Sequence, residues 1–345
     1  MAMAKSVPAL LALRFVPHAL APSPAALKAG VPPFRFFTWN HLAEGLDVHG
    51  DFTVDPAVLP WAFRGPRIAE ILAAANADIV SLQEVSNPAL VARALPGYSL
   101  FYAPKPESPA LAKGGPPDGT ALLVRTARFD VSSAETLHFS SAGETAISNQ
   151  VALLAELRDK AAGGRPLIVC AAHLKAKAGA ANDAVRDSQV RQLLAAATRL
   201  EAGRAGVPVI LGGDFNSSPT AGTAYAAVLQ CPSLRLASAY NRLPHPDEGA
   251  AVAATDAAAV PAAYASGEPA FTTWKFRGAE AKEKKEAIDY IWYGQGRGEG
   301  RPPVLGRLAT LELPGEADIG PGALPAAAWP SDHLALGADF AWLLA

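Results

Sequence analysis

Val207-Pro208-Val209-Ile210-Leu211-Gly212-Gly213-Asp214-Phe215-Asn216 is an apolar run that ends in two glycines, a carboxylate and a carboxamide. Glycine has the conformational freedom to let a backbone turn tightly after a buried strand. Side chains alternate along an extended chain, so Asp214 and Asn216 are expected on one face and Phe215 on the other. Taken alone, the pattern is also typical of an ordinary strand that ends in an Asp/Asn turn. A functional interpretation therefore depends on partners elsewhere in the chain.

Short apolar runs alternate with helical patterns from Phe34 onward. Helices are predicted over about residues 66–75 and 183–200, where apolar residues recur at helical spacing. Because predicted strands outnumber helices, we expect two β-sheets packed together with helices outside, a layered α/β or α+β sandwich. The runs that predict strands are 34–39, 78–85, 98–103, 120–125, 150–157, 167–174, 207–211, 288–293 and 334–340.

The composition limits the classes of function. With 345 residues, 50% of them hydrophobic, the chain can bury a large core. Lysine and arginine number 30 against 32 aspartates and glutamates, a net charge of -2, so any recognition of phosphate must be local. The 2 cysteines make neither a disulfide framework nor a metal cluster. They predict reduced packing residues in an intracellular, cytoplasmic protein.

Two segments differ from the rest. Residues 1–33 contain lysine and arginine but no acid, and many prolines and alanines. They predict an unstructured N-terminal tail, with a mitochondrial or other organellar targeting segment as the alternative. Residues 243–268, rich in Ala, Pro and Asp, predict a long surface loop inside one domain that runs from 34 to 345. No apolar run approaches the roughly 20 residues that a membrane-spanning helix needs, and we expect a monomer.

Polar side chains recur where the predicted strands begin or end. Carboxylates inside apolar strands are costly unless a charge or a metal compensates them. Carboxylates and amides favour a hard ion such as Mg²⁺, with Mn²⁺ as an alternative. Such an ion, a carboxylate that orients water, and imidazolium or amide donors together suit hydrolysis of a phosphate ester. The residues concerned are Asn40, Gln83, Glu84, His173, Lys175, Asp214, Asn216, Asp289, Asp332 and His333.

At these residues the chain resembles the endonuclease/exonuclease/phosphatase superfamily, in its deadenylase-like branch. Within that branch it is most similar to the nocturnin subfamily, through segments 104–106, 115–119, 149–152, 272–277 and 319–325. The resemblance covers about residues 34–342 and implies a four-layer α/β/β/α sandwich of two mixed β-sheets flanked by helices. The main segments are Asn40, Gln83-Glu84-Val85, His173-Leu174-Lys175-Ala176-Lys177, Gly213-Asp214-Phe215-Asn216, Ile288-Asp289-Tyr290-Ile291-Trp292-Tyr293 and Pro330-Ser331-Asp332-His333.

The resemblance also implies a role for each site residue. Glu84 is the principal Mg²⁺ ligand, with Asn40 and Asp332 near the ion or its waters. Asp214 orients or deprotonates the attacking water. Contacts to phosphoryl oxygens come from Asn216 and His173, while His333, steered by Asp289, stabilises the transition state. The substrate-binding candidates are Lys105, Lys175, Lys177, Lys275 and Arg277.

Each of these residues also has a purely structural interpretation. Glu84 is then a strand-end surface carboxylate, Asp289 a partner in a structural ion pair, and His173 a core histidine whose hydrogen bonds are satisfied. The lysines and the arginine are then charges on a solvated face. The mixed-sign run 282–286 predicts a solvated loop.

Three functions compete at this stage. The first is removal of the 2′-phosphate of NADP(H) to give NAD(H), the second is 3′ to 5′ exonuclease action on an RNA poly(A) end, and the third is noncatalytic binding. The third is disfavoured because every motif carboxylate and histidine is present. A single-strand exonuclease needs a basic track with stacking aromatics, so the charge balance favours the first. Lys177 stands where the subfamily commonly has arginine, and it offers a point charge in place of a two-pronged fork.

Overall fold

The computed structural model describes residues 13–48, 51–140, 147–202, 206–242, 267–295 and 303–344. These residues form two mixed β-sheets. The seven-stranded sheet has the order β1-β14-β15-β2-β3-β5-β4, and the six-stranded sheet has the order β10-β13-β9-β8-β7-β6. The strands are β1 (Phe15–Pro17), β2 (Phe34–Asn40), β3 (Ile79–Val85), β4 (Tyr98–Pro104), β5 (Gly119–Arg125), β6 (Phe129–Ser140), β7 (Ile147–Asp159), β8 (Arg165–His173), β9 (Val209–Asp214), β10 (Ala237–Ser238), β13 (Asp289–Gly294), β14 (Leu305–Leu311) and β15 (Leu336–Trp342).

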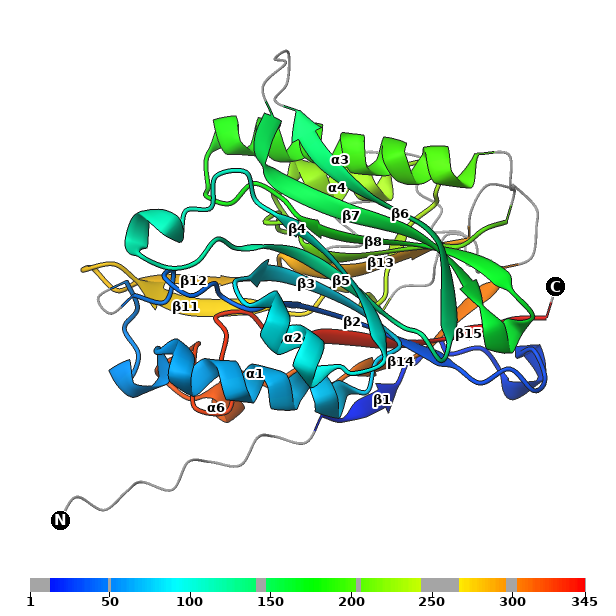
Figure 1. Ribbon diagram of the computed structural model, residues 1–345, viewed down its shortest axis with the longest axis horizontal. Coiled ribbons are helices and arrows are strands. Elements are labelled where there is room, and N and C mark those ends of the chain that lie inside the picture. The colour runs from blue at the N-terminus through cyan, green and yellow to red at the C-terminus, as the bar shows by residue number, and fades with distance from the viewer. Residues whose placement is uncertain are drawn as a thin grey trace.

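Helices cover the outer face of each sheet (Figure 1). The helices α1 and α2 lie on the seven-stranded sheet, and α3 and α4 lie on the six-stranded sheet. This arrangement confirms the predicted sandwich of two sheets flanked by helices. The bounds are α1 (Trp61–Ala75), α2 (Pro88–Ala94), α3 (Ala180–Glu201), α4 (Thr223–Leu229) and α6 (Glu316–Ile319), with short 3-10 turns η1 (Pro24–Ala26), η2 (Pro56–Val58), η3 (Leu111–Lys113) and η4 (Lys160–Ala162).

The three largest apolar clusters of the described residues form layers. The central layer lies between the sheets, where Phe36 of one sheet packs in the same cluster as Val169 and Ile210 of the other. The outer layers lie under the helices. In α1, Ile68 and Leu72 are buried one turn apart, as the predicted helical spacing requires. The apolar spacing in the sequence therefore corresponds to the buried face of the helix.

The glycines of the opening stretch act differently from the expectation. Gly212 and Gly213 lie inside β9 and do not form a tight turn after it. A Cβ on Gly212 would lie 2.3 Å from Phe36 Cε1, and one on Gly213 would lie 1.9 Å from the Ala172 carbonyl oxygen. The two sheets approach closely at Gly212, and β8 approaches β9 closely at Gly213, because these residues have no side chain. Phe215 is buried against Tyr290 and Trp292, as the alternation predicts.

Two other expectations need correction. Within the predicted tail of residues 1–33, β1 pairs with β14 at the edge of the seven-stranded sheet, and Leu27 bridges to Leu343. The strand is too short to show a period. Residues 282–286 are not a loop but strand β12 (Lys282–Glu286), which pairs with β11 (Thr273–Arg277) in a two-stranded hairpin. The predicted loop at 243–268 lies outside the described residues except for its last two, so the domain boundaries stay a prediction.

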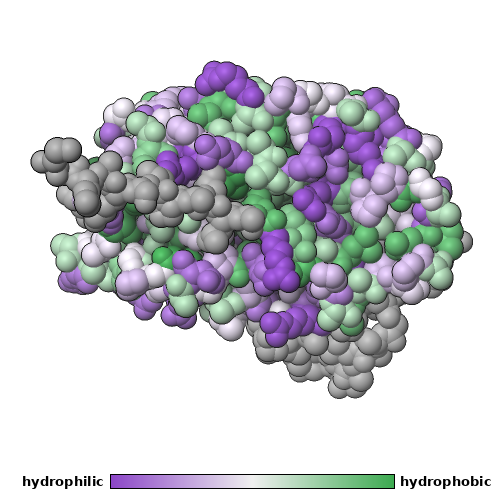
Figure 2. All heavy atoms as spheres, turned by 90° about the horizontal axis from the view of Figure 1, so that it is seen from below, coloured by the Kyte–Doolittle hydropathy of each residue, from purple (hydrophilic) through white to green (hydrophobic). Residues whose placement is uncertain are grey.

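The described surface agrees with the expectation of no membrane-spanning helix. No helix among the described residues is long and apolar enough to cross a bilayer. Hydrophilic and apolar residues are interspersed over the face in Figure 2. The exposed large apolar side chains of the described residues are far apart in the sequence: Leu20, Val48, Leu111 and Leu344.

Candidate active site

The topology brings the predicted site residues to one edge of the sandwich. β2 runs parallel to β3, and β8 runs parallel to β9, so the carboxyl ends of each pair lie together. His173 is the register partner of Asp214, and Asp214 is also the partner of Asp289 on antiparallel β13. The two sheets meet here because Asn40 of β2 reaches Asp214 of β9. Strand pairing therefore places these side chains before any ligand is considered.

One carboxylate oxygen is the centre of this cluster. Asp214, 1% exposed, directs its Oδ2 to Asn40 Nδ2 at 3.0 Å, His173 Nε2 at 3.6 Å and His333 Nε2 at 3.8 Å. Its Oδ1 accepts a hydrogen bond from the backbone N–H of Asn216 at 2.9 Å. Groups from both sheets thus converge on a single buried acid, which is the arrangement that a shared reaction centre requires.

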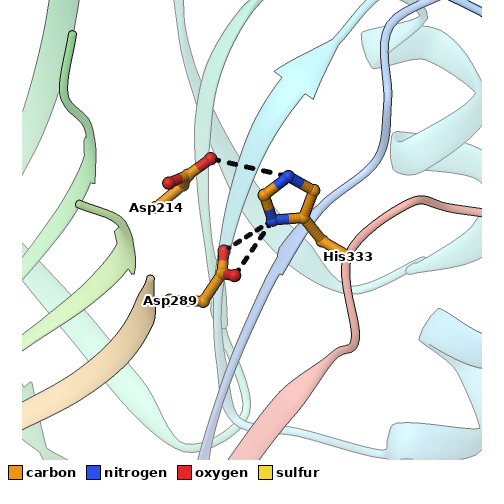
Figure 3. Close-up of side chains that lie close together, drawn as sticks. All are labelled: Asp214, Asp289 and His333. Atoms are coloured by element: carbon orange, nitrogen blue, oxygen red, sulfur yellow. Dashed lines mark hydrogen bonds and ion pairs between the residues drawn. The ribbon is translucent and has the colours of Figure 1, made fainter. Parts of the chain in front are cut away.

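His333 is held between two carboxylates (Figure 3). Its Nδ1 lies 2.9 Å from Asp289 Oδ2, and its Nε2 faces Asp214. Thr272 Oγ1 donates to Asp289 Oδ2 at 2.6 Å and accepts from the Asp289 backbone N–H at 3.0 Å. Burial acts to lower the pKa of His333, but the charges of Asp289, Asp332 and Asp214 outweigh it and the net shift is upward. The imidazolium form of His333 is therefore favoured.

His173 has the opposite electrostatic character. Burial, helped by the positive charge of Lys105, lowers the pKa of His173 to about 4. At neutral pH its ring is uncharged and carries a single N–H. Its Nδ1 is buried and has no hydrogen-bond partner among the described residues. The surroundings of the two site histidines thus shift their pKa values in opposite directions, upward for His333 and downward for His173.

Glu84 is aimed into the site by a local irregularity of β3. The pairing of β3 with β5 shifts register between Leu82 and Val85, and Glu84 adopts a left-handed φ of 54°. Such backbone is uncommon for a non-glycine residue and is frequent at functional sites. Glu84 Oε2 accepts from the Ala43 backbone N–H at 3.0 Å, and Oε1 lies 3.4 Å from Asn40 Nδ2. Asn40 therefore links the Glu84 and Asp214 carboxylates.

The donor set suits a hard divalent cation. Asp214, Asp289 and His333 each offer a ligand atom, and these atoms lie within 4.8 Å of one another, a candidate metal site to which His333 contributes only as the neutral imidazole. Glu84 adds carboxylate oxygens beside Asn40. Carboxylates outnumber cations among these residues, and a divalent ion would compensate the excess. The residues present therefore fit a hard divalent cation.

Asp332, the third predicted ligand, has a cation of its own. Lys275 Nζ lies 2.5 Å from Asp332 Oδ2 and 3.4 Å from His333 Nε2. Burial tends to raise the pKa of Asp332, but the charges of Lys275, His333 and Arg277 hold it well below its usual range. Asp332 Oδ1 lies 3.9 Å from His333 Nε2. Asp332 is thus ionised and adjacent to the histidine, and its predicted contact with a metal or its waters stays a prediction.

The predicted substrate-binding cations fall into two groups. Lys105 and Lys275 are buried and ion-paired, with Asp118 and Asp332 respectively. Lys175, Lys177 and Arg277 are partly or fully exposed. The Arg277 guanidinium lies over the Phe52 ring and donates to the Leu46 carbonyl. Two of the five predicted substrate-binding cations are therefore buried and three reach solvent, and their contact with a substrate stays a prediction.

Asn216 follows β9 in a left-handed conformation, with φ of 48°. Its Nδ2 donates to the Leu174 carbonyl at 3.2 Å, just beyond His173. Asparagine tolerates this conformation better than most residues. Asn216 therefore lies next to Asp214 and His173, and its contact with a phosphoryl oxygen stays a prediction.

Thr272, Asp118 and Ser331 are polar residues that sequence reasoning did not place in the site. Thr272 fixes Asp289, and Asp118 pairs with Lys105. Ser331 Oγ donates to the Asn40 carbonyl at 2.6 Å. All lie inside or beside the segments that carry the family resemblance. Their position in those segments is the one feature of the sequence that could have pointed to them. Their contacts join parts of the chain far apart in sequence, which no local pattern reveals.

Comparison with known proteins agrees with this geometry. The sequence matches the Endonuclease/Exonuclease/phosphatase family over residues 37–333. It is 34% identical to nocturnin of Rattus norvegicus over 320 residues, which is 90% of this chain and 66% of the relative. It is 30% identical to carbon catabolite repressor protein 4 homolog 3 of Arabidopsis thaliana over 193 residues, covering 54% of this chain and 40% of that protein.

A solved structure shows the same fold. The human nocturnin catalytic domain with bound sulfate anion superposes with a TM-score of 0.66 at 30% sequence identity, covering 90% of this chain and 94% of that one. The predicted similarity to nocturnin is thereby confirmed. The chain spans about two thirds of the length of the rat relative.

Proposed function

The chain belongs to the endonuclease/exonuclease/phosphatase family as a nocturnin-like phosphoesterase, and we propose that it removes the 2′-phosphate of NADP(H) in a Mg²⁺-dependent reaction. The products are inorganic phosphate and NAD(H). The observation that carries the proposal is the convergence of Asn40, His173 and His333 on one oxygen of buried Asp214. A carboxylate so placed, with cationic and neutral donors around it, suits attack of water on a phosphate ester.

Glu84 and Asn40 are proposed to hold the metal, with Asp332 near its waters. Glu84 is suited to this because its carboxylate is held by a backbone N–H and lies against Asn40, next to Asp214. When bound, the ion would neutralise charge on the phosphoryl oxygens and on the departing oxygen. Mn²⁺ is proposed as a substitute, because it also accepts oxygen ligands.

The remaining residues act either on the attacking water or on the negative charge of the phosphoryl group. Asp214 accepts a proton from the attacking water, whose oxygen forms a bond to phosphorus while the bond from phosphorus to the ribose 2′-oxygen breaks. The departing 2′-oxygen takes up a proton and becomes the hydroxyl of NAD(H), and the proton on Asp214 returns to solvent. Asn216 and neutral His173 donate hydrogen bonds to phosphoryl oxygens. His333, kept cationic by Asp289, stabilises the negative charge of the transition state. Each role uses the protonation state that its surroundings favour.

The distribution of cations supports a small substrate. A protein that tracks a single strand needs a run of basic residues and stacking aromatics. Among the predicted cations, Lys105 and Lys275 are buried beside carboxylates, and Lys175, Lys177 and Arg277 are the ones with solvent exposure, so the chain shows no long basic track among these residues. A dinucleotide with one terminal phosphate needs fewer such charges than a polynucleotide does. NADP(H) is therefore favoured over RNA.

The decisive experiment compares two substrates under the same conditions. Purified protein with Mg²⁺ is incubated with NADPH, and separately with an RNA that carries a 3′ poly(A) tail. We expect release of inorganic phosphate from NADPH with formation of NADH. Shortening of the RNA without phosphate release from NADPH would instead identify a 3′ to 5′ poly(A) exoribonuclease, an outcome retained because of the partial match to carbon catabolite repressor protein 4 homolog 3.

A further inference from the structure

The connection between β4 and β5 carries a buried ion pair. Lys105 directly follows β4 and Asp118 directly precedes β5, and the antiparallel pairing of Pro104 with Gly119 brings the two residues together. Lys105 Nζ lies 2.5 Å from Asp118 Oδ2, and the side chains are 5% and 0% exposed. Burial takes both charges away from solvent, so each depends on the other for compensation.

Asp118 is fixed in orientation by further contacts. Ser108 Oγ donates to Asp118 Oδ1, and the Lys105 backbone N–H donates to the Asp118 carbonyl at 2.9 Å. The strands approach so closely that a Cβ on Gly119 would lie 2.3 Å from the Ala103 carbonyl oxygen. Ser108 holds Oδ1 and the backbone is held on either side, so Asp118 presents Oδ2, which accepts no hydrogen bond among the described residues, to the Lys105 ammonium.

The pair lies next to the active site. The charge of Lys105 acts on His173, whose Nε2 lies 3.6 Å from Asp214 Oδ2. Figure 1 shows the β4–β5 connection and the β11–β12 hairpin at the same end of the molecule. The strand register adds that Gly119, the neighbour of Asp118, pairs with Val85, the neighbour of Glu84, so the Lys105–Asp118 pair lies at the strand edge that carries the site.

A buried ion pair is weak evidence for a role in stability. Desolvation of two charges offsets most of their attraction, and apolar side chains of similar volume are often as stabilising. A lysine ammonium has three N–H donors, and Asp118 engages one side of it. The group retains donors for an anion while its position is fixed by the carboxylate.

We propose that Asp118 is a positioning residue that holds the Lys105 ammonium on the His173 side of the site, where it meets the phosphate of the substrate. The inference rests on the proposed hydrolysis of a phosphoester, but it does not depend on which phosphoester is used. Asp118 acts through Lys105 and does not itself touch the substrate.

The test uses Asp118→Asn, Lys105→Met and the double variant. Activity is measured on whichever phosphoester the unaltered protein hydrolyses, NADPH or A-tailed RNA. If the protein does not hydrolyse NADPH, the proposed function fails, and the role of Asp118 is still tested on the RNA. We expect each single change to raise KM by about tenfold or more with a much smaller change in kcat, because ground-state grip on the phosphate is lost. The double variant should be no worse than Lys105→Met, since Asp118 acts through Lys105.

A matched control breaks another buried ion pair. Asp159, 0% exposed, accepts from Arg128 Nε at 2.7 Å at the start of β6 and the end of β7. Asp159→Asn should lower the melting temperature and leave KM unchanged. Calorimetric binding of inorganic phosphate gives a readout independent of turnover, and Asp118→Asn should weaken that binding by a similar factor.

Comparing the melting temperature and KM of the variants distinguishes a positioning role of Asp118 from a purely structural one. If the pair were only structural, the double variant, which leaves neither charge unpaired, would recover the KM of the unaltered protein together with its melting temperature. That result would overturn the proposal. So would a folded Asp118→Asn variant with normal KM and phosphate binding, or an equal rise in KM for Asp159→Asn. If Asp118→Asn does not fold, the comparison of Lys105→Met with the double variant still decides between the two roles.

Discussion

His333 Nδ1 lies 2.9 Å from Asp289 Oδ2, while the opposite nitrogen of the same ring faces Asp214 at 3.8 Å. The imidazole thus lies between a carboxylate that orients it and a carboxylate that is proposed to handle the attacking water. Thr272 fixes the outer carboxylate by a 2.6 Å hydrogen bond. The geometry makes the protonation state of His333 dependent on Asp289.

Asp289→Asn should lower kcat and shift its pH dependence. Asp289 is the largest influence that raises the pKa of His333, so an uncharged partner lets that pKa fall. If imidazolium is the active form, activity declines as pH rises through the pKa, and the declining limb should move to lower pH. We expect kcat to fall by about a hundredfold. If the declining limb of the pH–rate profile lies at the same pH in Asp289→Asn and in the unaltered protein, the titrating group is not His333.

Glu84→Ala and Asp214→Ala should differ in metal binding although both lose activity. Glu84 is the proposed ligand, so its removal should abolish binding of Mg²⁺ by calorimetry or of Mn²⁺ by electron paramagnetic resonance. Asp214→Ala should retain most of that binding while activity falls by about a thousandfold, because the acceptor for the proton of water is lost. Equal loss of ion binding in both variants would assign Asp214 to the metal as well, as its place in the candidate cluster allows.

Lowering the pH should destabilise the fold through a histidine outside the proposed machinery. His41 is buried, and its Nε2 has no hydrogen-bond partner in the part of the chain that the structure describes. Burial, followed by the charge of Arg64, lowers the pKa of His41 to about 3. The unfolded chain binds this proton near pH 6.5 and the folded protein does not, so stability falls as pH drops from 6.5 toward 3.

The effect of His41 can be isolated by substitution. At pH 5 the loss from this residue is about 2 kcal/mol. His41→Gln should therefore show a smaller decrease in unfolding free energy between pH 7 and pH 5 than the unaltered protein, measured by urea denaturation. An identical decrease in both proteins would assign the acid sensitivity to other groups, such as His173.

The layered fold could be predicted because its strands carry strong local patterns. The run that became β9 and the spacing that became α1 each bury one face, and the polar ends of parallel strands meet at one edge. The site residues Asp214, His173 and Asp289 are assembled by strand register alone. Here the local pattern and the tertiary structure agree.

Other features depend on contacts that no local pattern encodes. β1 is short and gains its partner from β14 nearly three hundred residues away. β12 carries charged residues at every position, so it shows no apolar alternation, and its partner β11 decides its conformation. The burial of Lys105 and Lys275 depends on Asp118 and Asp332, which meet them only after folding. Long-range pairing therefore sets the environment of each cation.

Gly212→Ala should destabilise the protein by forcing the two sheets apart beneath the site. The added methyl group would lie 2.3 Å from Phe36 Cε1 and 3.3 Å from Thr38 Cβ, in a region where both strands are buried. Overpacking of this kind costs about 1–3 kcal/mol. Because Thr38 is two residues from Asn40, the displacement should also weaken the Asn40–Asp214 contact and reduce kcat.

Gly322→Ala is the control for this change. Nothing lies within 4 Å of a Cβ at Gly322, so the same substitution adds a methyl group without a collision. Urea denaturation and kcat should match the unaltered protein for Gly322→Ala and fall together for Gly212→Ala. If Gly212→Ala kept full stability and activity, the close approach of β2 and β9 would not be what sets the position of Asp214.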